Sequence, residues 1–132
     1  MIKTLIFWCP YIGNVGTAKA VSESTMQSVV ETSGRLGISV QAAANAAAFG
    51  AMNASLSASI DYGQNTSSTA RDVTTGLTTG AIKGANRIEV DPAKSIKAVL
   101  HGATDSIYTK ADQLSINPTL IVKAAQAGFN QA

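Results

Sequence analysis

Charged and aromatic side chains are scarce in this sequence. Asp, Glu, Lys and Arg make up 14% of its 132 residues, and Phe, Trp and Tyr make up 5%, whereas about 25% of an average protein is charged. Alanine, glycine, serine and threonine take their place, so the interior has to be packed from small side chains that each bury little apolar area. We expect a single domain in which self-association supplies part of the missing burial.

Cysteine and histidine occur once each, as Cys9 and His101. One cysteine excludes an internal disulfide and a cysteine-based metal site, and a metal site at His101 would need further ligands at suitable spacing. A nucleophilic Cys9 would need a nearby base, and no paired carboxylates stand out. We therefore predict no enzyme activity, no catalytic residue, no metal and no cofactor, and we do not expect a small-molecule partner.

The ten basic residues are scattered, and the formal net charge is only +2. Binding to nucleic acid through released counterions needs clustered phosphate contacts, so no nucleic-acid partner is expected. A basic residue does recur six positions after each predicted helix cap, as Lys19, Arg71, Lys97 and Lys123, with Asn45 as the exception. These residues indicate a solvated face or, alternatively, ion pairs with an acidic residue of a second copy, for which the candidates are Asp72, Asp105 and Asp112.

A 26-residue internal repeat runs through the chain, and such repeats indicate the architecture directly. Four glycines have this spacing, and a residue suited to cap a helix stands eleven positions before each: Gly50, Gly76, Gly102 and Gly128, with Ser39, Asn65, Asp91 and Asn117. Pro92 and Pro118 fall at the first helical position, where proline is tolerated. The repeat predicts five helices, at about 14–34, 40–60, 66–86, 92–112 and 118–130.

Links of a few residues favour antiparallel neighbouring helices. The predicted fold class is therefore all-α, an up-and-down helical array with close packing of small residues. Residues 13–132 form its single helical-repeat domain. Residues 1–12 are predicted to be an extended apolar arm or a short strand.

The N-terminal segment has further interpretations. Its apolar run is too short to span a bilayer, and Pro10 interrupts it, so we expect no cleaved signal peptide and a protein that is cytoplasmic or exported without cleavage. The run Lys3–Trp8 followed by Gly13-Asn-Val-Gly-Thr-Ala-Lys19 resembles the opening βα unit of a nucleotide-sugar glycosyltransferase, which would imply an anion site at a helix N-terminus. The resemblance covers these residues alone, and we expect a helix cap and a tight turn there.

Small residues recur at every fourth position of the predicted helices. Glycine inside a helix costs about 1 kcal/mol relative to alanine, so such rows indicate close helix packing, either within the chain or between copies. Residues 36–60 carry no charge and have no strongly polar face, so other helices, other copies or lipid should surround them. The candidate interface residues are Gly76, Gly80, Gly84, Gly50, Ala46, Ala54, Trp8, Phe7 and Phe129.

These features predict a non-enzymatic structural subunit that self-assembles into a filament, ribbon or tube, with copies of itself as the partner. Uncapped apolar ends of a repeat array favour such contacts. One alternative is a membrane-active glycine-zipper protein that forms a pore or bundle, although scattered charges in the later helices are costly in lipid. The other is a soluble helical adaptor that binds a partner helix.

Overall fold

The computed structural model describes the backbone of residues 15–132 and the side chains from residue 18 onward. These residues form five helices and no strand: α3 (Val15–Leu36), α4 (Val40–Asp61), α5 (Thr66–Arg87), α6 (Pro92–Leu114) and α7 (Thr119–Gln131). The all-α prediction is confirmed, and each helix begins and ends within two residues of its predicted bounds. The predicted arm or strand at residues 1–12, with Phe7, Trp8 and Cys9, lies outside the described residues.

Capping side chains set the helix starts. Ser39 Oγ accepts a hydrogen bond from the Ala42 amide at 3.2 Å, Asn65 Oδ1 from Ser68 at 3.0 Å, and Asp91 Oδ1 from Ala93 at 2.9 Å. Each of these bonds satisfies an amide that has no partner inside its helix. At α7 the prediction is one residue early, because Pro118 precedes the helix.

The four links share one geometry, which follows the sequence repeat. A residue with positive φ follows each of the first four helices, at Gly37, Gly63, Glu89 and Ser115. The next amide donates to the carbonyl five residues earlier, as in the bond of 3.1 Å from Ile38 to Ser33, and corresponding bonds close the other three links. This is the Schellman motif, and it turns the chain back sharply after every helix.

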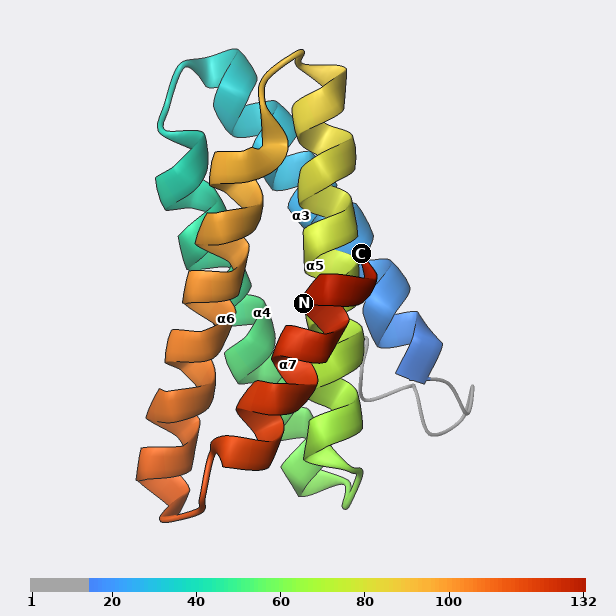
Figure 1. Cartoon of the computed structure of the whole chain (residues 1–132), viewed down its shortest axis with the longest axis vertical. Helices are drawn as coiled ribbons and strands as arrows, with labels where there is room; N and C mark the ends of the chain where they lie inside the picture. The colour runs from blue at the N-terminus through green and yellow to red at the C-terminus, as the bar shows by residue number, and fades with distance from the viewer. Residues whose placement is uncertain (1–14) are drawn as a thin grey trace.

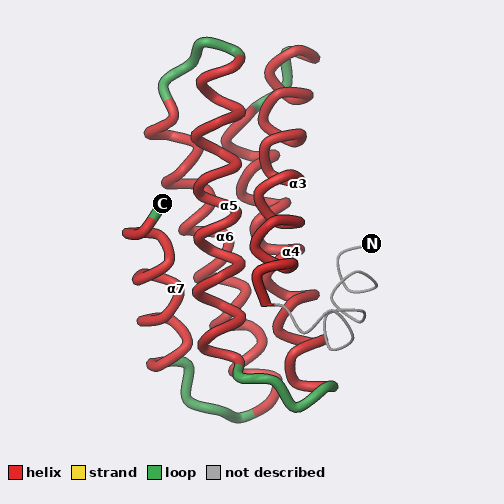
Figure 2. Tube along the Cα trace, turned by 90° about the vertical axis from the view of Figure 1, so that its right-hand side faces the viewer, coloured by secondary structure: helices red, strands yellow, loops and turns green. Residues whose placement is uncertain are grey.

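The helices form two layers that zigzag along the chain. One layer contains α3, α5 and α7, and the other contains α4 and α6 (Figure 1). Helices α3, α4 and α5 each pack on the helix two places later, and every helix also packs on its sequence neighbours. The view along the layers places α7 at one side and α3 with α4 at the other, with α5 and α6 between them (Figure 2). The up-and-down array is therefore a short stack with two distinct sides.

The core lies around α5, which contacts α3, α4, α6 and α7. It is built mostly from alanine, with a few larger side chains such as Met26, Met52, Leu77 and Ile107. Among the described residues, five buried hydroxyls have no hydrogen-bond partner, those of Ser22, Ser55, Thr74, Thr78 and Ser106. The predicted small-residue interior is thus present, and part of it is polar.

Candidate functional site

Glycines join helices that are two places apart in the chain. A β-carbon built on Gly76 of α5 would collide with the carbonyl oxygen of Lys19 on α3. Moving both residues forward by one repeat gives Gly102 and Asn45, a further repeat gives Gly128 and Arg71, and the same collision arises in both pairs. We call this contact a glycine seam. In a glycine seam, a glycine of one helix lies on a backbone carbonyl of the helix two places earlier, and the two residues are as far apart in the sequence as Lys19 and Gly76.

The α3–α5 seam is the longest. Gly80 lies on the carbonyl of Glu23, and a β-carbon on Gly84 would lie 2.9 Å from the carbonyl oxygen of Gln27. Because these carbonyls ascend in the same order as the glycines, α3 and α5 run parallel in a fixed register. Only a residue without a β-carbon permits this approach of two helix backbones.

Ion pairs flank the same seam. Lys83 Nζ lies 2.7 Å from Glu23 Oε2, and Arg87 Nε lies 3.5 Å from Glu31 Oε1. Lys83 and Arg87 each stand three residues after a seam glycine, on the edge of the contact. Both basic side chains are more than half exposed, so these pairs contribute about 1 kcal/mol or less each and mainly favour one register.

The recurring basic residues have a role in this arrangement that the sequence did not indicate. The side chains of Lys19, Arg71, Lys97 and Lys123 are exposed, in agreement with a solvated face. The carbonyl groups of Lys19 and Arg71, and of Asn45 at the equivalent position, receive the seam glycines. Since every residue has a carbonyl, side-chain identity carried no signal for this contact; only the constant separation could have revealed it.

The structure places the predicted interface residues that it describes in three environments: buried, exposed and half-buried. Gly76, Gly80 and Gly84 are buried against α3 within the chain. Gly50 and Ala46 are exposed on α4, and no atom of the described residues lies within 4 Å of a β-carbon built on Gly50. Ala54 and Phe129 are half-buried.

The two sides of the stack present a hollow each. On α3 a hollow of about 290 Å³ is lined by Ser24, Gln27, Ser28, Glu31, Thr32 and Arg35. We call this hollow, together with Gly50 on α4, the start face. On α6 a hollow of about 320 Å³ is lined by Lys97, Leu100, His101, Thr104 and Asp105. We call it, together with Lys123 on α7, the end face.

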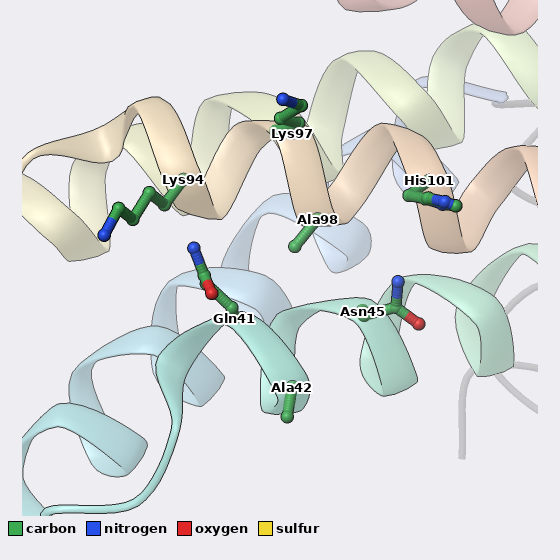
Figure 3. Close-up of a pocket in the computed structure, with 7 residues that line it drawn as sticks. All are labelled: Gln41, Ala42, Asn45, Lys94, Lys97, Ala98 and His101. Carbon is green, nitrogen blue, oxygen red and sulfur yellow. The ribbon is translucent and has the colours of Figure 1, made fainter.

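A larger groove of about 560 Å³ lies between the first halves of α4 and α6, as Figure 3 shows. Lys94, Lys97 and His101 line one wall, and Gln41 and Asn45 line the other. Among the described residues, no carboxylate, hydroxyl or thiol side chain lines this groove. Its lysine, histidine and amide side chains therefore offer hydrogen-bond donors to a ligand.

His101 is exposed on α6, with Nδ1 3.9 Å from Asp105 Oδ2 one turn later. In the part of the chain that the structure describes, no three histidine, cysteine or acidic side chains gather as metal ligands would. No helix of that part combines the length and apolar character of a membrane span.

Comparison with known proteins gives no precedent for this chain. No family model, curated protein or solved structure matches it. The proposals below therefore rest on the geometry of the chain itself.

Proposed function

We propose that this protein is a non-enzymatic structural subunit that assembles with copies of itself into a filament, ribbon or tube by helix packing. The observation that carries the proposal is the glycine seam, which recurs with one register through the array while the start and end faces stay open in the described residues. Units of a repeat array bury their faces by stacking. A face that no described helix covers, at each side of the stack, offers the same burial to another copy.

Apolar side chains on the poles of the stack also support association. Leu36 and Ile38 are 69% and 56% exposed at one pole, where α3 ends and α4 begins. Leu114 and Ile116 are 44% and 41% exposed at the opposite pole, where α6 ends and α7 begins. Single exposed apolar residues are ordinary, but clusters of them favour an interaction surface.

Sedimentation velocity of the purified chain without detergent tests the proposal. A structural subunit should shift from small species to polymers as its concentration rises, because assembly follows mass action. A species that stays monomeric over a hundredfold range of concentration would contradict it. Flotation with lipid vesicles on the same sample would detect the membrane-active alternative.

A further inference from the structure

We infer that copies of this chain join by continuing the glycine-seam register, with the start face of one copy packed on the end face of another. This inference rests on the function proposed above and specifies its surfaces. Each helix contributes one residue to a series of seam carbonyls, namely Lys19, Asn45, Arg71, Lys97 and Lys123. Each helix also has one residue at the position of the seam glycine, namely Ser24, Gly50, Gly76, Gly102 and Gly128.

Within the chain, each glycine of the second series from Gly76 onward lies on the carbonyl that the helix two places earlier contributes to the first series. Gly76, Gly102 and Gly128 use the first three carbonyls. Among the described helices, the carbonyls of Lys97 and Lys123 are therefore left without a glycine partner at the end, and Ser24 and Gly50 are left without a carbonyl partner at the start. A second copy that continues the register places Ser24 on Lys97 and Gly50 on Lys123.

The second of these contacts matches a glycine to an unused carbonyl. Gly50 is the one glycine of the series with open space at its β-carbon in the described structure, and Lys123 is exposed on α7. The contact of α4 of the next copy on α7 would thus repeat the contacts that Gly76, Gly102 and Gly128 make within the chain.

The neighbouring contact, of Ser24 of the next copy on Lys97, is less close. A serine β-carbon keeps two helices further apart than glycine does. Helix α3 of the next copy would therefore lie on α6 with more space between the backbones, and polar groups would contribute more to that contact.

The two hollows are lined by the residues that this register brings together. Ser24, Ser28 and Thr32 occupy the positions that Gly76, Gly80 and Gly84 occupy on α5, and they line the hollow of the start face. Three residues further on stand Gln27, Glu31 and Arg35, which line the same hollow. On α6 the carbonyl positions Lys97, His101 and Asp105 line the hollow of the end face.

This register places two pairs of opposite charge across the junction, Asp105 with Arg35 and Lys97 with Glu23 of the next copy, and one like-charge pair, Asp105 with Glu31 of the next copy. Within the chain, Glu23 on α3 pairs with Lys83 on α5. The equivalent pair at the junction is His101 with Glu31 of the next copy, and one turn further along Asp105 stands opposite Arg35 of the next copy. Glu31 and Arg87 form an ion pair within the chain. If the repeat is continued into the next copy, Lys97 and Glu23 of that copy have the same spacing in the sequence, so they stand opposite each other.

The partner that packs on each face is a second copy of this chain, because one chain carries both halves of the contact. The end face also continues the layers that the pairs α4–α6 and α5–α7 already form. The two faces differ, and the described residues of each copy leave one of each uncovered, so the contact is head-to-tail. A head-to-tail contact that does not close into a ring produces an open polymer.

A charge swap tests the inference. Arg35→Asp should raise the concentration at which polymers appear about tenfold, because it places a second carboxylate beside that of Glu31 opposite Asp105 at every junction, and Asp105→Arg should raise it less, because Arg35 and its ion-pair partner Glu31 both face that position. The double variant restores opposite charges and should polymerise within about threefold of the unmodified chain, as expected for coupled residues. Asp112→Arg is the matched control, since it makes the same charge change on α6 beyond the reach of α3 in this register.

Light scattering would measure each onset concentration, and circular dichroism below the onset would verify folding. Recovery in the double variant, with little change in Asp112→Arg, supports the inference. If the unmodified chain polymerises and both single variants have the same onset concentration as it, the inference is wrong. It is also wrong if the double variant does not recover the onset concentration of the unmodified chain. In both cases the proposed self-assembly itself would stand. An unmodified chain that never polymerises would contradict both the inference and the proposed function.

Discussion

The α-carbon of Gly102 on α6 lies so close to the carbonyl oxygen of Asn45 on α4 that a β-carbon between them would overlap that oxygen. Ala48 also lies nearby, with its β-carbon 3.2 Å from the position that a β-carbon on Gly102 would take. Backbone atoms cannot rotate away as a side chain can, so two helices have to move apart if Gly102 gains a methyl group. The separation of α4 and α6 therefore depends on this glycine.

We predict that Gly102→Ala destabilises the unassembled chain by about 1–2 kcal/mol. Overpacking a tight contact costs about 1–3 kcal/mol, and the better helix propensity of alanine offsets up to about 1 kcal/mol of it. Gly50→Ala is the matched control from the same position of another repeat. Because it meets open space, it should stabilise the chain by up to about 1 kcal/mol in urea unfolding, and equal effects of the two changes would contradict the seam.

Gly50→Ala should have the opposite effect on assembly. In the proposed junction its new β-carbon would meet the carbonyl of Lys123 in another copy, so polymers should need a higher protein concentration although each subunit is more stable. Gly50→Leu should suppress polymers more strongly. Unfolding measured below the onset concentration, alongside the onset itself, separates the two effects; a parallel change in both would argue that α4 does not face another copy.

The links allow a prediction about left-handed residues. Glu89 and Ser115 hold φ values of 58° and 54°, a conformation that glycine adopts at the equivalent Gly37 and Gly63. A residue with a β-carbon destabilises the folded chain by about 1–2 kcal/mol in this conformation. Replacing it with glycine removes that cost, but the greater freedom of glycine in the unfolded chain offsets part of the gain. Glu89→Gly and Ser115→Gly should each stabilise the chain by about 0.5–1 kcal/mol, whereas Gly37→Ala should destabilise it, as thermal unfolding would report.

Two adjacent threonines of α5 should respond oppositely to valine. The hydroxyl of Thr74 is buried without a partner among the described residues, whereas Thr75 Oγ1 donates to the Arg71 carbonyl at 2.8 Å and lies 3.1 Å from the Gly128 carbonyl oxygen. An unsatisfied buried hydroxyl costs about 1–3 kcal/mol. Thr74→Val should therefore stabilise the chain by about 1 kcal/mol, and Thr75→Val should destabilise it by a similar amount. Urea unfolding of both variants compares them directly.

The repeat made the helices and their starts predictable. Ser39, Asn65 and Asp91 have side chains that suit only a few positions of a helix, so a periodic pattern of them marks the helix starts. The seam partners could not be predicted in this way, because the contact uses the backbone carbonyls of Lys19, Asn45 and Arg71.

The place of a helix in the array determines whether its repeat glycine is buried, and sequence similarity between the repeats does not indicate this. Gly50 and Gly102 occupy the same place in the repeat, yet one is exposed and the other is buried. The difference arises because α6 has a helix two places before it in the described structure, on which its glycine packs. Local sequence describes the helix but not how many helices precede it, so the open faces became visible only in the folded chain.

Negative-stain electron microscopy of the purified, detergent-free protein above its association concentration tests the central claim most directly. A subunit that continues its own register should form long polymers of uniform width, in which one junction repeats along the whole length. Particles of the size of a single chain at every concentration would contradict the account, because the start and end faces would then remain unjoined.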